Sequence, residues 1–149
     1  GWTYLASVED LYSRKIIGWA FGKTMDAELA KKALKNASLN IKKTKGIILQ
    51  TDLGSQYTSN IFEEYLAELK IRHSYSRKGC PYDNSCIESF HSILKKEEVN
   101  LKKYKDFKEA YNAIFEFIQA WYNRERIHSC LNYKTPDEVH SEDEESFAA

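Results

Sequence analysis

The sequence has little cysteine, proline and glycine, and each shortage excludes a class of protein. Three cysteines among 149 residues, with no Cys-x-x-Cys pair, exclude a disulfide framework and a zinc ribbon and favour a reducing compartment. Two prolines and six glycines, beside 42% hydrophobic residues, exclude collagenous, low-complexity and disordered chains. No apolar run approaches the roughly 18 residues of a membrane span, and no signal-peptide pattern is present. We therefore expect a soluble cytoplasmic protein with one compact core.

An excess of charge is also absent, because 22 Lys and Arg residues balance 22 Asp and Glu residues. Taken whole, a net charge of zero gives no support to nucleic-acid binding. The distribution is uneven, since residues 137–149 hold six acids and no Lys or Arg, which leaves 16 acids against 22 basic residues and a charge of +6 on residues 1–136. We therefore expect a basic core domain over 1–136, followed by an acidic tail over 137–149 that frays.

Strand-like and helical patterns alternate along the chain. Residues 4–8 and 16–21 predict a hairpin, and 71–75 predicts a further strand. The all-apolar run at 47–49 predicts a strand that is buried on both faces. A loop without apolar periodicity is expected over 76–84. Helical spacing predicts helices over 26–39, 59–69, 85–98 and 107–121. Strands that alternate with helices indicate an α/β layer structure.

Two carboxylates lie at positions that suit chemistry. Asp52 follows the strand at 47–49, and open α/β sheets present ligand-binding groups at such strand ends. Taken alone, an Asp there is more often a turn residue. Glu88 lies in the first turn of the helix predicted from Ser85, and Ser85-x-x-Glu88 fits a capping box. The two roles compete, because a metal-bound carboxylate is less free to accept the capping hydrogen bond.

Basic side chains lie near these acids in the sequence. Lys95 is seven positions, or about two helical turns, after Glu88 and on the same helix face, which suits metal binding beside a phosphate backbone. A lone lysine is more commonly just solvated surface. Arg77 and Lys78 in the loop are either phosphate contacts or surface. His128 has no His, Cys or Glu partner at metal spacing, so we expect a structural or phosphate-contacting role.

A series of motifs runs in a fixed order along nearly the whole chain. They are Trp2-x-Tyr4-Leu5-Ala6, Asp10-Leu11-Tyr12-Ser13-Arg14, Gly18-Trp19, Thr51-Asp52-x-Gly54-Ser55-Gln56-Tyr57, Lys78-Gly79, Asp83-Asn84, Glu88-Ser89-Phe90, Leu94-Lys95 and Trp121-Tyr122-Asn123-x-x-Arg126-x-His128 with Tyr133 and Thr135-Pro136. Together they closely resemble the integrase-type catalytic core of bacterial insertion-sequence transposases, which is similar to the retroviral integrase core (the rve superfamily). Thirty-five residues separate Asp52 from Glu88, the spacing that this family uses between its second and third catalytic acids.

The resemblance implies a ribonuclease H-like fold, in which helices flank a mixed sheet, and DNA transposition by metal-dependent cleavage and strand transfer. In the family three carboxylates hold two divalent metals, and oxygen ligands without Cys or His clusters favour Mg²⁺ or Mn²⁺. Carried over by match, Asp52 and Glu88 are the catalytic metal ligands. The implied DNA-binding residues are Arg77, Lys78, Lys95, Arg126 and His128. The implied partners are insertion-element ends, target DNA and further copies of the chain, in the bacterial cytoplasm at the nucleoid.

One element of the family pattern is absent from the sequence. The first catalytic Asp of the family lies in a segment resembling Asp-x-Thr-Tyr on the strand before the hairpin, and Gly1 begins after that point. Asp10 matches the hairpin motif instead, so it is not a substitute. We therefore expect a core domain truncated at its N-terminus, with an exposed strand edge. Its 149 residues should bind metal weakly and leave DNA uncut.

Two alternatives remain open at this point. The first alternative is that the chain is a non-catalytic DNA-binding or oligomerisation module. An in-frame Asp-x-Thr-Tyr segment upstream of Gly1 would favour the transposase over this module. A ribonuclease H-like nuclease acting on RNA–DNA hybrids would share the metal chemistry. The C-terminal run Tyr122-Asn123-x-x-Arg126-x-His128 speaks against that nuclease.

Overall fold

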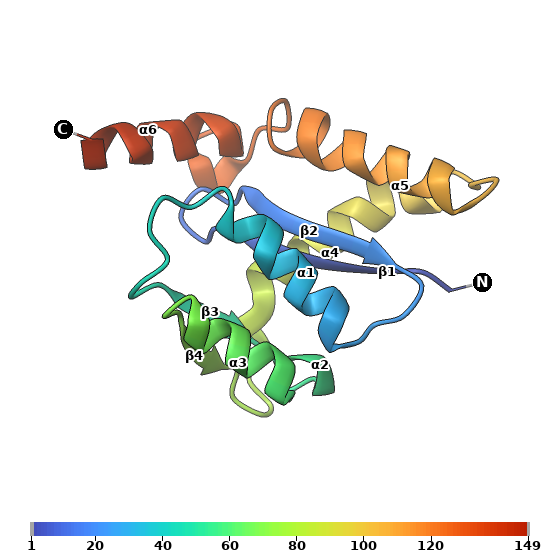
Figure 1. The fold of residues 1–149 in the computed structure, drawn as a ribbon. Helices are drawn as coiled ribbons and strands as arrows, with labels where there is room; N and C mark the ends of the chain where they lie inside the picture. The colour runs from blue at the N-terminus through green and yellow to red at the C-terminus, as the bar shows by residue number, and fades with distance from the viewer. Residues whose placement is uncertain (1, 149) are drawn as a thin grey trace. The chain divides into compact units, whose positions relative to one another are not determined.

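The computed structural model describes residues 2–148, with side chains described for 2–80 and 83–142. The chain divides into two compact units (Figure 1). The first unit consists of the chain up to Val8 and of Ile17–Ile87, and the second consists of Glu9–Ile16 and the chain from Glu88 onward. Two compact units therefore replace the single core expected from the length.

The N-terminal hairpin forms as predicted, from β1 (Tyr4–Glu9) and β2 (Ile16–Gly22). The turn between the strands is closed by Asp10, whose carbonyl accepts the Arg14 N–H at 2.7 Å. The Asp10 carboxylate also accepts the Ser13 hydroxyl at 2.6 Å. Asp and Ser supply such turn bonds from short polar side chains, which explains why this segment reverses the chain.

Helix α1 (Ala27–Ser38) confirms the helix predicted from residue 26. Asp26 is its N-cap, and the carboxylate accepts the Leu29 N–H at 2.9 Å. The helix lies close to β2, because a Cβ on Gly18 would come within 2.3 Å of the Ala37 main-chain nitrogen. Glycine at position 18 therefore sets the distance between the helix and the hairpin.

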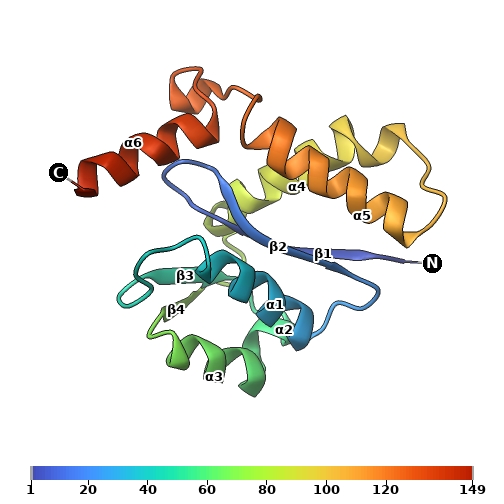
Figure 2. The ribbon, with the colours of Figure 1, turned by 45° about the horizontal axis from the view of Figure 1, so that its top comes forward.

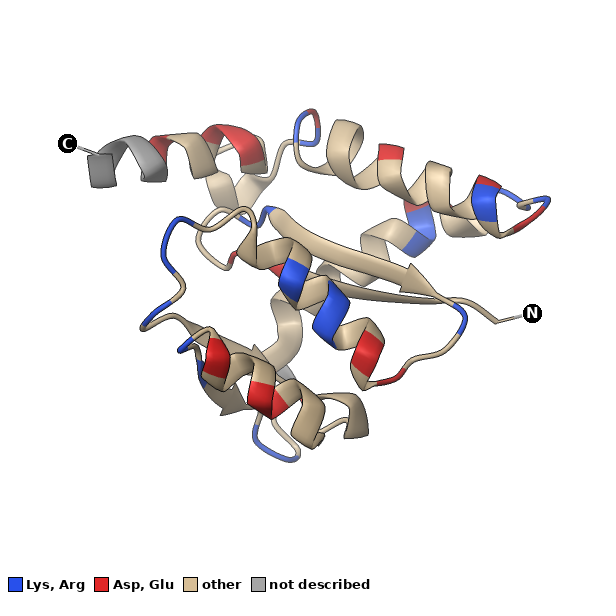
Figure 3. Cartoon of the chain, in the orientation of Figure 1, with Lys and Arg blue, Asp and Glu red and all other residues tan. Residues whose placement is uncertain are grey.

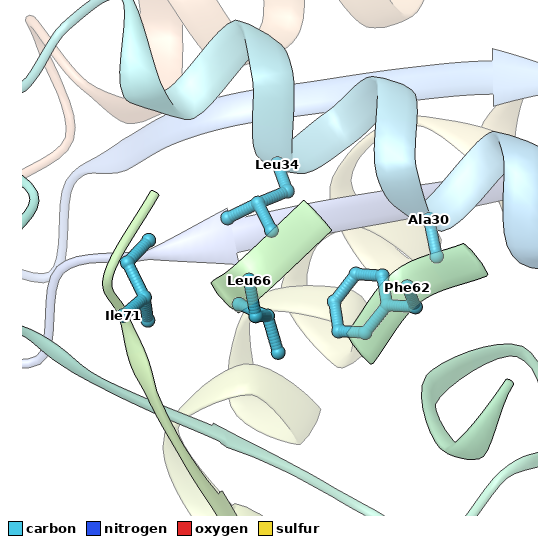
Figure 4. Close-up of a cluster of buried hydrophobic side chains, with 5 residues drawn as sticks. All are labelled: Ala30, Leu34, Phe62, Leu66 and Ile71. Atoms are coloured by element: carbon cyan, nitrogen blue, oxygen red, sulfur yellow. The ribbon is translucent and has the colours of Figure 1, made fainter. Parts of the chain in front are cut away.

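The opposite side of α1 packs on helix α3 (Asn60–Glu68), which Ser59 caps through its hydroxyl. Figure 4 shows two α1 side chains facing two α3 side chains, with a fifth residue just before the next strand. These five buried residues are Ala30, Leu34, Phe62, Leu66 and Ile71. Figure 2 shows α1 between the hairpin and α3 from a second direction. The cores on both sides of this helix hold the first unit together.

The second strand pair is parallel and consists of β3 (Ile48–Thr51) and β4 (Arg72–Tyr75). Ile48 is 59% exposed, so the prediction of a strand buried on both faces is wrong. Only the face toward the α1–α3 core is covered, because exposed Ile48 and Gln50 alternate with half-buried Leu49 and buried Thr51. Across residues 2–148, β1 and β3 each have one strand neighbour, so the expected mixed sheet consists of two separate pairs.

The second unit is helical. It holds most of α4 (Ser85–Glu97), together with α5 (Phe107–Glu116), a π-helical segment (Phe117–Tyr122) and α6 (Pro136–Ala148). The predicted apolar stripe continues past α5, but Phe115 and Trp121 are 48% and 41% exposed. The Asn123 N–H donates to the Ile118 oxygen at 3.1 Å, a π-helical hydrogen bond at the end of this segment.

Residues 137–148 of the expected tail lie in α6 and are helical, and residue 149 lies outside the described residues. Asp137 in the first turn of α6 forms an ion pair with Lys15 at 3.0 Å, and Val139 is buried. Figure 3 shows acidic residues along the first half of α6, whereas Lys and Arg mark α1 and the loop after it. The acidic charge expected at 137–149 therefore begins on an anchored helix. No helix among the described residues is long and apolar enough to cross a membrane.

Candidate active site

Asp52 lies directly after β3, on an exposed turn. Its Oδ1 accepts the Gly54 N–H at 2.7 Å, so the turn role that Asp commonly has is formed. A Cβ at position 54 would lie 2.8 Å from Asp52 Oδ1 and 2.9 Å from Gln56 Oε1, so both side chains would have to shift to admit one. No described residue donates a hydrogen bond to Oδ2. One carboxylate oxygen thus holds the turn while the other is accessible to a ligand.

A polar network lies next to this turn, buried at Thr51 and at the His73 side chain and partly exposed at Glu63. His73 on β4 places Nδ1 at 2.6 Å from Glu63 Oε1 and Nε2 at 2.7 Å from the Thr51 hydroxyl oxygen. The Tyr75 hydroxyl donates to the same Glu63 oxygen, and this bond is the largest cause that lowers the pKa of Glu63. Burial and then the Glu63 carboxylate raise the pKa of Tyr75 to about 12. Sequence analysis missed this network, because its members come from three elements and share no spacing.

Glu88 lies in the first turn of α4 with its side chain exposed. The capping box predicted for Ser85 and Glu88 is wrong, since no described residue bonds the Glu88 carboxylate. A 3₁₀ turn over Pro81–Asn84 runs straight into α4, so Ser85 is already helical and does not occupy the cap position. The carboxylate is therefore not engaged in the competing structural role.

The loop expected over 76–84 lies between β4 and α4, and hydrogen bonds between described residues hold it. Asp83 accepts the Arg77 N–H at 2.8 Å and the Arg77 Nε–H at 3.3 Å. Gln50 on β3 donates to the Asp83 main-chain oxygen at 2.7 Å, and Ser76 donates to Asn84 at 2.7 Å. The Arg77 guanidinium, 77% exposed, remains accessible to a phosphate, although Asp83 already holds it.

Lys78 and Lys95, the two predicted lysine contacts, are both exposed. Lys95 lies on α4 one turn after His91, and burial together with the Lys95 charge lowers the pKa of His91. An exposed ammonium on the helix that carries Glu88 is placed to meet a phosphate backbone. The structure thus gives the lysines accessible positions, and their DNA contacts stay predictions.

Arg126 and His128 have structural contacts within the second unit. The Arg126 guanidinium donates to Glu97 from Nη2 at 3.1 Å and from Nε at 3.2 Å. The indole of Trp121 donates to the same carboxylate at 3.0 Å. The His128 ring meets Tyr122 edge-on at 5.2 Å, and burial lowers the pKa of His128. These contacts favour a structural role, and DNA binding by either residue stays a prediction.

The predicted acids lie in different units, Asp52 in the first and Glu88 at the start of the second. In the described part of the chain no group of three or more His, Cys, Asp or Glu side chains could hold a metal ion. Carboxylate oxygens nevertheless suit hard cations such as Mg²⁺ and Mn²⁺. The donor chemistry of Asp52 and Glu88 fits such an ion, and the described ligand set is smaller than three.

Comparison with known proteins places these motifs in a family. An integrase core domain model matches residues 1–81, and a second integrase core domain model matches residues 69–136. The chain belongs to the integrase core domain family. This confirms the resemblance drawn from the motifs.

Similar proteins include bacterial transposases and a retroviral enzyme core. The chain is 40% identical over 136 residues to the transposase for insertion sequence element IS904 of Lactococcus lactis, covering 91% of this chain and 54% of that protein. It is 39% identical over 138 residues to transposase InsF for insertion sequence IS3A of Escherichia coli, covering 93% and 48%. The chain thus spans about half the length of these relatives.

The catalytic core domain of BIV integrase has a similar fold. It superposes with a TM-score of 0.71 at 18% identity, covering 99% of this chain and 91% of that one. At this identity the likeness concerns the fold alone, and it confirms the predicted ribonuclease H-like, integrase-core class.

Proposed function

We propose that this chain is the catalytic core region of an insertion-sequence transposase that cuts DNA and joins a 3′-hydroxyl to a target phosphodiester. The observation that carries the proposal is the state of the two carboxylates that fit the family motif. Asp52 uses one oxygen for its turn and leaves the other accessible, and Glu88 is exposed without a capping bond. The chain's membership of the integrase core domain family supports the assignment of these two carboxylates.

In this proposal Asp52 and Glu88 would each present a carboxylate oxygen to Mg²⁺ or Mn²⁺, together with an acid that the described residues do not supply. An ion held there would supply Lewis-acid chemistry, namely polarisation of a water or 3′-hydroxyl and stabilisation of the leaving oxygen in an in-line displacement. Asp52 holds its carboxylate in one orientation through the Gly54 N–H. The exposed ammonium groups of Lys78 and Lys95 would bind backbone phosphates and so orient the DNA.

The proposal includes inactivity of these 149 residues on their own, because two carboxylates leave one family position empty. The test incubates the purified chain with labelled insertion-end DNA in Mg²⁺ or Mn²⁺, beside a chain extended by an Asp-x-Thr-Tyr segment before residue 1. We expect cleavage and strand transfer only in the extended chain, and their loss with Asp52→Asn. If the 149 residues cut DNA by themselves, and the Asp52→Asn substitution stopped that cleavage, the proposed inactivity would be contradicted.

A second candidate is a non-catalytic DNA-binding or oligomerisation module, which the charge of +6 on residues 1–136 fits. The same assay separates the two functions. If the extended chain binds insertion-end DNA with unchanged affinity after Asp52→Asn and never cleaves it, the catalytic proposal fails and the binding module remains.

A further inference from the structure

The polar network next to Asp52 joins side chains from three elements through hydrogen-bonding atoms, although apolar side chains could fill the same space. Thr51 on β3, His73 on β4 and Glu63 on α3 meet through side chains that lie 10 and 22 residues apart in the sequence. The His73 side chain is 7% exposed and Thr51 is 7% exposed, so their polar atoms have left water. Buried polar groups cost stability unless they are paired, and here the pairs form one connected chain.

This chain of contacts ends on the main chain of the proposed metal ligand. The Thr51 hydroxyl oxygen lies 2.7 Å from His73 Nε2 and 3.0 Å from the Asp52 main-chain oxygen. The Thr51 main-chain oxygen also accepts the Ser76 N–H at 2.7 Å. The residue before Asp52 is therefore fixed through both its hydroxyl and its carbonyl, while the Gly54 N–H fixes the carboxylate itself.

Glu63, at the other end of this series of contacts, is also fixed. Glu63 Oε1 faces His73 Nδ1 at 2.6 Å and accepts the Tyr75 hydroxyl, so two groups from β4 hold one carboxylate on α3. His73 also packs on Phe62 with ring centroids 5.7 Å apart and on Tyr75 at 4.1 Å. A ring held by packing on both neighbours has one orientation, and its Nε2 therefore points at Thr51.

We propose that Glu63, His73 and Thr51 are positioning residues that fix the orientation of the Asp52 carboxylate. The inference rests on the proposed function, since it assigns a purpose to the support of a metal ligand. A ligand carboxylate must be held close to its productive geometry, and supporting hydrogen bonds commonly do this. Apolar side chains of the same shape would fill the space equally well. They would not make the contact of the Thr51 hydroxyl with the Asp52 main-chain oxygen.

The test uses the full chain and compares Thr51→Val with Thr51→Ser. Valine keeps the branched shape and removes the hydroxyl, whereas serine keeps the hydroxyl. The first readout is hydrogen exchange of the Gly54 amide, with the buried Leu66 amide as the reference. We expect Thr51→Val to speed exchange at Gly54 by about fivefold to tenfold, the loss of roughly one hydrogen bond, and Thr51→Ser to leave it within about twofold. Unchanged exchange at Gly54 in Thr51→Val, relative to Leu66, would overturn the proposal.

A second variant covers the case in which Thr51→Val does not fold. His73→Phe keeps an aromatic ring against Phe62 and removes both nitrogens, so the same acceleration at Gly54 is expected. The second readout is Mn²⁺ affinity, which we expect to fall several-fold in Thr51→Val and to persist in Thr51→Ser. If wild-type chain binds no Mn²⁺, the proposed function of Asp52 fails, and the exchange result still decides whether the network positions the turn.

Discussion

Strands β2 and β3 follow each other in the chain with one helix between them, yet they are built in opposite ways. Six of the seven residues of β2 are buried, and its Gly18 lies against α1. In β3, Ile48 and Gln50 are exposed, and the buried end is Thr51, a polar residue. The difference teaches that one strand provides stability through apolar contact, while the other carries a polar network and the turn of Asp52.

The largest expected effect is on β2. Gly18→Ala would place a Cβ 2.3 Å from the Ala37 main-chain nitrogen, and neither backbone can move without separating α1 from the hairpin. We expect the free energy of unfolding to fall by about 3 kcal/mol in urea denaturation. Gly46→Ala is the matched control, because that glycine has a φ of +87° and nothing within 4 Å, so only backbone strain of about 1 kcal/mol is expected. Equal losses in both variants would contradict close packing of α1 on β2 as the cause of the Gly18→Ala effect.

The two strand pairs should also respond to pH with opposite signs. Burial raises the pKa of Glu9, at the end of β1, from 4.5 to about 8, so the stability that its protonated form provides is lost as pH rises through that interval. The Tyr75 hydrogen bond lowers the pKa of Glu63, so its stability is present above about pH 4.5 and is lost as pH falls.

Unfolding midpoints measured from about pH 2 to about pH 9 check this contrast, because Glu63 titrates below its usual range. Glu9→Gln should gain about 1–2 kcal/mol over the native chain at pH 9 and little at pH 4. Glu63→Gln should show the smaller change, a loss near neutral pH that vanishes in acid. If the unfolding midpoint of both variants changed with pH as it does in the native chain, the opposite pKa shifts of Glu9 and Glu63 would be contradicted.

Local patterns of the sequence were sufficient for much of the fold. Asp26 and Ser59 cap the predicted helices because an N-cap acts within three residues of itself. The exposure of Ile48 was not predictable, because an apolar run does not reveal how many of its faces a sheet covers. The π-helical hydrogen bond at Asn123 likewise has no local signature.

Part of the candidate site was likewise predictable from the sequence, and part is revealed only by the fold. Motif order and spacing predicted Asp52 and Glu88 as candidate site residues, because the motifs that carry the family resemblance are short contiguous segments. The contacts of His73 with Glu63 and Thr51 cross three elements, so only the folded chain reveals them. Spacing alone also favoured a cap for Glu88, which the 3₁₀ turn before α4 prevents.

The smallest effect on stability should accompany the largest effect on binding, at Asp52 itself. Asp52→Asn keeps an oxygen for the Gly54 N–H and removes the charge, so the free energy of unfolding should change by less than about 0.5 kcal/mol. Asp26→Asn is the matched control, because asparagine caps a helix as well as aspartate does.

The most direct test of the central claim is Mn²⁺ binding measured by paramagnetic broadening of amide signals in the native chain and in both variants. We expect Mn²⁺ to broaden the Gly54 and Leu53 signals in the native chain and in Asp26→Asn, and to leave them sharp in Asp52→Asn. Broadening that persists in Asp52→Asn, or that never occurs next to Asp52, would contradict the assignment of Asp52 as a metal ligand.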